Sequence, residues 1–144
     1  MSKPDRAMSY IVFEHILDKA KSTVADGGSS SFPVVLSHNA SADDLRLTLD
    51  IKPDLDCFRG HFPGNPVLPG VLQLHWAVAI GMAVFGYSEL PMEILRLKFK
   101  AVIVPPTAIN LALTRTAPLD VRFEYSAGEH QYSLGMLRFN GNQP

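Results

Sequence analysis

The sequence predicts an α+β fold in which an antiparallel sheet wraps one long apolar helix. Residues 71–85 are almost wholly apolar, and segments on both sides of them alternate apolar and polar residues with a period of two. Strands that gather before and after one helix are typical of an α+β domain rather than of repeated strand–helix units. With 144 residues the chain is long enough for one such domain, and we expect residues 1–144 to form it.

Three elements are expected before the central loop. Residues 6–25 carry a weak amphipathic pattern that predicts a helix, and the segment DGGSSS at 26–31 ends it. Residues 1–31 would then be an N-terminal extension of helix and loop. Phe32 to Leu36 is a short strand candidate, whereas Leu45 to Ile51 alternates throughout, as a half-buried strand does.

The central loop leads into the helix. Pro53 to Pro69 holds four prolines and two glycines, which prevent regular structure but permit a rigid shape. The apolar helix follows Gly70 and ends near Phe85, with Gly86 as its C-cap.

Four alternating segments follow the helix, around residues 95–100, 109–114, 119–125 and 132–136, and they predict an antiparallel meander. In the first segment, Leu95, Leu97 and Phe99 are expected on one face of the strand, and Arg96, Lys98 and Lys100 on the other.

Composition and charge exclude several classes of protein. Hydrophobic residues make up 47% of the chain and charged residues 19%, as in a packed globular protein rather than a disordered one. A net charge of -1 gives no general attraction to nucleic acid or anionic membranes, so neither is an expected partner. The single cysteine, Cys57, cannot form an internal disulfide, which favours a reducing cytoplasm. The apolar stretch 71–85 is shorter than the ~20 residues that span a bilayer.

The segment from Arg59 to Leu72, RGHFPGNPVLPGVL, carries the candidate chemistry. Histidine side chains in general titrate near neutrality, so His61 can act as a base or an acid, and the prolines around it should hold it in a defined position. Gly70 opens the helix, where unpaired N–H groups and the positive dipole end suit a developing oxyanion. A base beside such a site can abstract a proton next to a carbonyl. His75 lies four residues after Val71, on the same side as the helix start, and is a candidate second proton-transfer group.

These residues also have structural interpretations. His61 can satisfy backbone groups in its loop, and His75 can be a core histidine bonded to a backbone carbonyl, because the helix around it is apolar. Cys57 and His61 have a spacing that occurs in metal sites, but two ligands are too few, and no metal is expected.

The segment Gly60 to Leu72 resembles the hotdog-fold beta-hydroxyacyl-acyl-carrier-protein dehydratases of fatty-acid synthesis. It matches the family pattern G-H-F-P-G-x-P-hydrophobic-hydrophobic-P-G-V-L in full, and Leu95 to Pro105 resembles the family's next landmark. The resemblance covers roughly residues 32–140. It implies a hotdog fold, in which the sheet wraps the central helix and two subunits pair to form the working unit.

The resemblance implies roles for particular residues. His61 would remove the α proton of a 3-hydroxyacyl thioester, and the backbone N–H of Gly70 would bind the thioester carbonyl. The family places Glu or Asp five residues after that glycine, where it helps the hydroxyl leave, and His75 stands there; Ala79 replaces a common glutamine. A protonated His75 could donate a proton in place of the carboxylate. The sequence QLHW, ending at Trp76, resembles a divergent branch found in clusters for aryl polyenes and other specialised lipids.

The resemblance also implies contacts with the substrate and its carrier. The acyl substrate is expected against Phe62, Pro63, Gly64, Val71 and Trp76, and an acidic acyl carrier protein against Arg59, Arg96, Lys98 and Lys100. A solvated sheet face is the alternative interpretation of these cations.

Together these features predict a dehydratase that converts a 3-hydroxyacyl group on acyl carrier protein to the trans-2-enoyl thioester without a cofactor. A homodimer is expected, with pairing to another hotdog subunit as the alternative. Two other functions stay open. One is an acyl-thioesterase, which the lack of a carboxylate in the helix disfavours; the other is a non-catalytic acyl-binding or accessory hotdog subunit.

Overall fold

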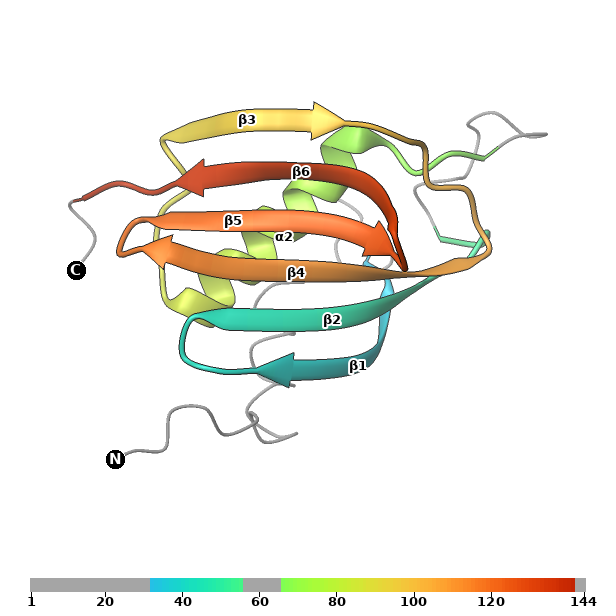
Figure 1. Ribbon diagram of the computed structural model, residues 1–144, viewed down its shortest axis with the longest axis horizontal. Helices are drawn as coiled ribbons and strands as arrows, with labels where there is room; N and C mark the ends of the chain where they lie inside the picture. The colour runs from blue at the N-terminus through green and yellow to red at the C-terminus, as the bar shows by residue number, and fades with distance from the viewer. Residues whose placement is uncertain (1–31, 56–65, 142–144) are drawn as a thin grey trace.

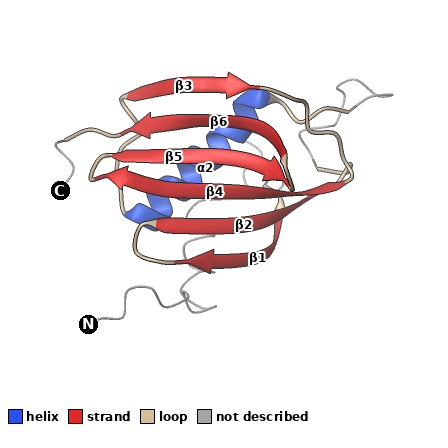
Figure 2. Ribbon diagram, viewed as in Figure 1, coloured by secondary structure: helices blue, strands red, loops and turns tan. Residues whose placement is uncertain are grey.

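The computed structural model describes residues 32–55 and 66–141, which form a six-stranded antiparallel sheet with one long helix against it (Figure 1). The elements are β1 (Val34–Ala40), β2 (Asp44–Ile51), α2 (Gly70–Phe85), β3 (Glu93–Phe99), β4 (Thr107–Ala117), β5 (Asp120–Ala127) and β6 (His130–Arg138). The strands lie in the order β1-β2-β4-β5-β6-β3. Figure 2 shows α2 across one face of the sheet, so the predicted α+β arrangement is confirmed. The helix predicted over residues 6–25 lies outside the described residues.

Local sequence signals located α2 and β2 well. The helix ends at Phe85 because Gly86 adopts the left-handed conformation at φ 80° and donates its N–H to the Met82 carbonyl at 2.9 Å. By contrast, β1 continues to Ala40, beyond the predicted end at Leu36. An irregularity between Val35 and Ser37 breaks its alternation, which hid the second half of the strand.

The predicted meander is correct only for β4, β5 and β6. Strand β3 pairs with β6 and lies at the edge of the sheet, although β4 follows it in the chain. The connection between β3 and β4 covers residues 100–106, which is long enough to cross the sheet end, and two prolines in it exclude a tight hairpin (Figure 1). Sequence periodicity carries no information on such a crossing.

A β-bulge in β3 overturns the predicted face assignment. Leu95 pairs with Met136 and Lys98 pairs with Leu134, so both Arg96 and Leu97 lie opposite Gly135. Because paired residues share a face, Leu95 lies on the outer face with Lys98, whereas Leu97 and Phe99 face the helix. Arg96 is the extra residue, with φ 54°, a left-handed conformation that costs most side chains about 1 kcal/mol or more.

The core lies between α2 and the inner face of the sheet. Alternate residues of β2, β4 and β5 are fully buried there, together with the helix positions that face them. The largest enclosed side chains are Trp76, Tyr125, Phe123 and Phe139, with Leu45, Leu47, Leu49 and Ile51 on β2. Within the described ranges, no helix is long and apolar enough to cross a membrane.

Two glycine-to-alanine changes should shift stability in opposite directions. A Cβ at Gly135 would lie 2.8 Å from the buried Phe123 ring, so Gly135→Ala should lower the free energy of unfolding by about 1–3 kcal/mol. The matched control, Gly81→Ala within α2, meets no atom within 4 Å and should raise it by about 0.5–1 kcal/mol. Denaturant unfolding measures both, and equal effects would contradict the close packing at the bulge.

Candidate active site

The structure describes one half of the predicted site. Arg59, His61, Phe62, Pro63 and Gly64 lie outside the described residues, so their roles stay predictions. The described half consists of the first turns of α2 and the strand β3 beside them.

The start of α2 presents free backbone donors. Pro69 is the N-cap, with extended ψ of 140° and no side-chain cap, and its carbonyl accepts hydrogen bonds from the N–H groups of Leu72 and Gln73. The N–H groups of Gly70 and Val71 have no acceptor among the described residues. At a helix N-terminus such donors carry partial positive charge, so they can stabilise a negative oxygen. The oxyanion role of Gly70 needs such a donor and stays a prediction.

Gly70 is in close contact with the Phe99 ring of β3. A Cβ on Gly70 would lie 2.8 Å from one atom of that ring, so any side chain here would displace it. An alanine here would therefore make the Phe99 ring shift. The Phe99 side chain is nevertheless 51% exposed, because β3 is the edge strand.

His75 lies on the exposed side of α2, one turn from Val71, which is 60% exposed. The interpretation of His75 as a core histidine is therefore wrong, whereas its predicted position beside the helix start is correct. Trp76 is fully buried and packs against Phe32 with ring centroids 6.2 Å apart, so the structure does not bring it together with Val71. Ala79 is also buried.

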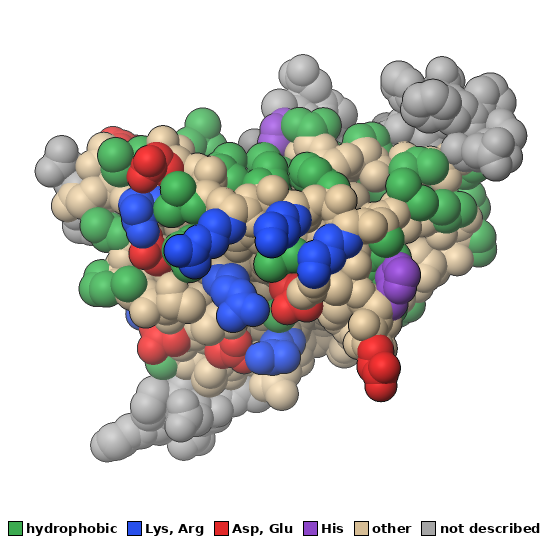
Figure 3. Space-filling model, turned by 45° about the horizontal axis from the view of Figure 1, so that its top comes forward, with side chains coloured by type: hydrophobic (Ala, Val, Ile, Leu, Met, Phe, Trp, Pro, Cys, Tyr) green, Lys and Arg blue, Asp and Glu red, His purple; other side chains and the backbone are tan. Residues whose placement is uncertain are grey.

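An apolar surface surrounds the helix start and the β3 edge. Its exposed members are Val71, Ile94, Leu97, Phe99, Val102 and Val104. Figure 3 shows hydrophobic side chains along this edge of the molecule. We call these six residues the edge surface. An exposed apolar surface of this kind commonly marks a place where another molecule binds.

Cations with no carboxylate partner among the described residues gather on β3 and on the outer face of the sheet, beside the edge surface. Four of the described Lys and Arg residues form ion pairs, namely Arg46, Lys52, Arg115 and Arg138. The others, Arg96, Lys98, Lys100 and Arg122, are exposed, and no described carboxylate lies within 4 Å of their charged groups. Figure 3 shows Lys and Arg side chains in a band across this face. We call these four residues the cation band.

Sequence reasoning missed Arg122 as a member of this band. Its pairing with Met136, which in turn pairs with Leu95, places it on the same face as Lys98. In the sequence, Arg122 is one charged residue in an alternating strand, which is typical of a solvated position. Only the strand order in the sheet brings Arg122 near β3.

A buried polar cluster behind the helix was also missed. Gln73 is 2% exposed, and its side-chain oxygen accepts a hydrogen bond of 2.7 Å from the buried Ser133 hydroxyl. Tyr125 donates its hydroxyl to the Gln73 carbonyl at 2.7 Å, and burial raises the pKa of that hydroxyl well above its usual value. Tyr125 is therefore a neutral donor throughout the physiological pH range.

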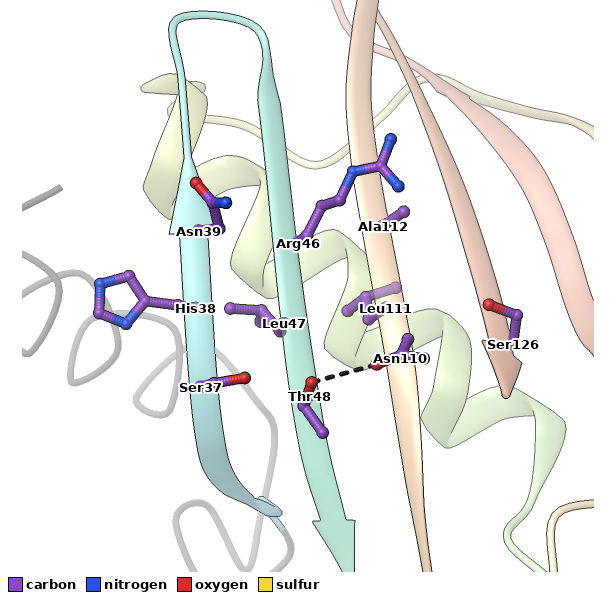
Figure 4. A pocket seen from close by; sticks show the side chains of 10 residues that line it. All are labelled: Ser37, His38, Asn39, Arg46, Leu47, Thr48, Asn110, Leu111, Ala112 and Ser126. Atoms are coloured by element: carbon purple, nitrogen blue, oxygen red, sulfur yellow. Dashed lines mark hydrogen bonds between the residues drawn. The ribbon is translucent and has the colours of Figure 1, made fainter. Parts of the chain in front are cut away.

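Other parts of the described chain are poorer candidates. A shallow hollow of about 250 Å³ lies across β1, β2, β4 and β5, lined by Ser37, Thr48, Asn110 and their neighbours (Figure 4). It opens on the outer face, where Thr48 bonds Asn110, and it is away from the helix start. Among the described residues, no group of three His, Cys, Asp or Glu could hold a metal ion.

Comparison with known proteins adds family evidence. The sequence model of the ApeI-like family, described as ApeI dehydratase, matches residues 37–136. A 3-hydroxyacyl-[acyl-carrier-protein] dehydratase FabZ of Haemophilus influenzae (strain PittEE) is 41% identical over 49 residues, which cover 34% of this chain and 32% of the relative. The matched part thus spans about a third of the length of that curated relative.

Two solved structures are similar over most of their length. "The Dehydratase Heterocomplex ApeI:P from Xenorhabdus doucetiae" matches with a TM-score of 0.66 and 26% identity, over 74% of this chain and 96% of that one. An uncharacterized protein from Erwinia carotovora subsp. atroseptica matches with a TM-score of 0.61 and 31% identity, over 74% of this chain and 94% of that one.

Adding a methyl group at the helix start tests the contact between Gly70 and Phe99. Gly70→Ala should lower the free energy of unfolding by about 1–3 kcal/mol, because the new Cβ overlaps the Phe99 ring. In a Phe99→Ala background the same change should cost almost nothing, because the ring is gone. A double-mutant cycle by thermal unfolding measures the difference. Additive effects would show that the ring moves aside freely.

Proposed function

Because the chain belongs to the ApeI-like dehydratase family, we propose that it dehydrates a 3-hydroxyacyl thioester carried on acyl carrier protein to the trans-2-enoyl thioester. Its fold is the hotdog fold, as the resemblance implied. The observation that carries the proposal is the pair of N–H groups on Gly70 and Val71, which have no acceptor in the described part of the chain, next to the exposed His75.

In the proposed reaction, the thioester carbonyl accepts hydrogen bonds at the helix start. His61 removes a proton from the second carbon of the acyl chain, and the N–H of Gly70 stabilises the oxyanion that forms. The electron pair of the broken C–H bond then forms the C2–C3 double bond. The C3–O bond breaks, and the hydroxyl leaves as water after it receives a proton. Both protons exchange with solvent between turnovers, and no metal or redox cofactor takes part.

We assign the second proton transfer to His75. It stands where the family has a carboxylic acid, and an imidazolium can donate a proton to a leaving hydroxyl as a carboxylic acid does. Its exposure within one chain allows it to exchange protons with water. His61 and His75 would work together, one neutral and one protonated.

The proposed site needs a second subunit to exclude water. Within residues 32–55 and 66–141, strand β3 has a neighbour on one side only, and an exposed strand edge with apolar side chains is a common pairing site. We propose that β3 and the edge surface pair with another hotdog subunit, which is a second copy of this chain in the expected homodimer. The similar structure titled as a heterocomplex supports a different hotdog subunit as the alternative.

The cation band is the proposed contact for the carrier protein. Arg96, Lys98 and Lys100 were predicted for this role together with Arg59, and Arg122 joins them from β5. These four cations have no carboxylate partner among the described residues and can attract an acidic partner, whereas each of the other described Lys and Arg residues lies within 4 Å of a carboxylate.

Mass spectrometry of a panel of 3-hydroxyacyl carrier proteins tests the reaction. The wild type should cause loss of water, and His75→Ala should lower the rate by about 100-fold, as removal of a general acid does. His75→Glu should recover much of the rate, because it restores the family's residue. His61→Ala should also be inactive. Release of free acid would instead indicate a thioesterase. If no panel member reacts but His75→Glu gains activity, the chain is an accessory subunit.

A second test distinguishes an effect on carrier-protein binding from an effect on protein stability. Arg96→Gly removes a charge from the cation band and also relieves the left-handed backbone, so it should raise the free energy of unfolding by up to about 1 kcal/mol. It should also raise KM for a carrier-bound substrate several-fold, increasingly at low salt. Lys98→Ala, the control on ordinary backbone, should raise KM without stabilising the protein. A more stable Arg96→Gly variant with unchanged KM would exclude Arg96 from the contact.

A further inference from the structure

Gln73 is an unusual residue for its position. It faces the sheet from the first turns of α2, is 2% exposed, and interrupts an otherwise apolar helix face. A buried amide is destabilising unless it is hydrogen-bonded, so its presence needs a reason beyond packing. Its side-chain oxygen accepts the Ser133 hydroxyl at 2.7 Å, and its side-chain nitrogen faces the Leu68 carbonyl at 3.4 Å.

These contacts close a ring around the helix start. Ser133 on β6 lies directly opposite Phe99 on β3 in the sheet register, and the Phe99 ring packs on Gly70. Gly70 begins the helix that carries Gln73, and the Gln73 side chain returns to Ser133. The ring therefore joins the edge strand, the neighbouring strand and the first turn of the helix.

The segment before the helix is held by the same residues. The Leu68 carbonyl faces the Gln73 amide, the Leu68 N–H donates to the Ile103 carbonyl at 2.8 Å, and the Gln73 N–H donates to the Pro69 carbonyl at 3.2 Å. Leu68 and Pro69 immediately precede Gly70. Their backbone is thus fixed on the inner side by Gln73, while Phe99 fixes Gly70 on the outer side.

We propose that the hydrogen bond from Ser133 to Gln73 is a positioning contact that holds the Gly70 N–H in its catalytic direction. The catalytic role of this N–H rests on the proposed function. The claim that the Ser133–Gln73 hydrogen bond holds Gly70 in place does not depend on that function. Gln73 and Ser133 act through Gly70 and touch no reacting atom. The same contact links the edge strand, where a second subunit would pair, to the start of the helix. A shift of the strand would therefore also shift the helix start.

Tyr125 provides a contrast within the same cluster. Its hydroxyl donates to the Gln73 backbone carbonyl at 2.7 Å, whereas the Gln73 side-chain amide forms its hydrogen bonds with Ser133 and the Leu68 carbonyl. Removal of this bond should lower stability without freeing the helix start. A purely structural cluster would make no distinction between Tyr125 and Ser133.

The experiment compares Ser133→Thr with Ser133→Val in the full chain. The two side chains have nearly the same shape, but Thr keeps the hydroxyl, whereas Val has a methyl group in its place. Tyr125→Phe is the matched control for loss of a buried hydrogen bond. Ser133→Ala, which adds no volume, replaces the Val variant if the core does not accept the larger side chain.

Two readouts are measured on each variant. The first is the NMR order parameter of the Gly70 amide, which should fall from about 0.85 to below about 0.7 in Ser133→Val and stay near the wild-type value in Ser133→Thr and Tyr125→Phe. The second is dehydration kinetics. Ser133→Val should lose about tenfold in kcat with little change in KM, since a misdirected oxyanion donor affects the transition state more than substrate binding. Ser133→Thr should keep most of the rate.

The outcomes separate the two claims. If the Gly70 amide stays rigid in Ser133→Val, the positioning role of the Ser133–Gln73 hydrogen bond is overturned, whatever the dehydration activity of the variant. Equal losses in Ser133→Val and Tyr125→Phe overturn it as well, since the cluster would then be structural. If the wild type dehydrates no substrate while the Gly70 amide loosens as expected, the proposed function fails and the mechanical contact stands.

Discussion

The contact between the Phe99 ring and Gly70 is the constraint on which the proposed site depends. It places the edge strand of the sheet directly on the first residue of the helix, so close that a Cβ on Gly70 would displace the Phe99 ring. The helix begins there with no side-chain cap, and its first two N–H groups have no acceptor among the residues that the structure describes. The strand that would pair with another subunit is therefore in direct contact with the residue whose N–H would bind a carbonyl.

The two faces of β3 belong to two different surfaces of the protein. The bulge at Arg96 and Leu97 turns the second half of the strand, so that Leu97 and Phe99 face the helix while Lys98 lies on the outer face. An apolar edge surface near the helix start and a cation band on the outer face suit an acyl chain and an acidic carrier, respectively. Side chains of β3 would thus contact both the acyl chain and the carrier protein of the same substrate.

Much of this fold could be predicted from the sequence, because its signals are local. The helix end at Gly86 and the alternation of β2 are each set by neighbouring residues. The features that were missed depend on distant residues. The place of β3 beside β6, the bulge opposite Gly135 and the bond between Gln73 and Ser133 all join segments separated by many residues. In the sequence, Gln73 was only an interruption of an apolar stretch.

The most direct test of the central claim is deuterium incorporation at the second carbon of the acyl chain. A 3-hydroxyacyl carrier protein is incubated with the protein in D2O, and the recovered substrate is analysed by mass spectrometry. The account predicts deuterium in the substrate with the wild type and none with His61→Ala, because proton removal beside the Gly70 donors is reversible. Water loss without any dependence on His61, or no deuterium with any substrate of the panel, would contradict it.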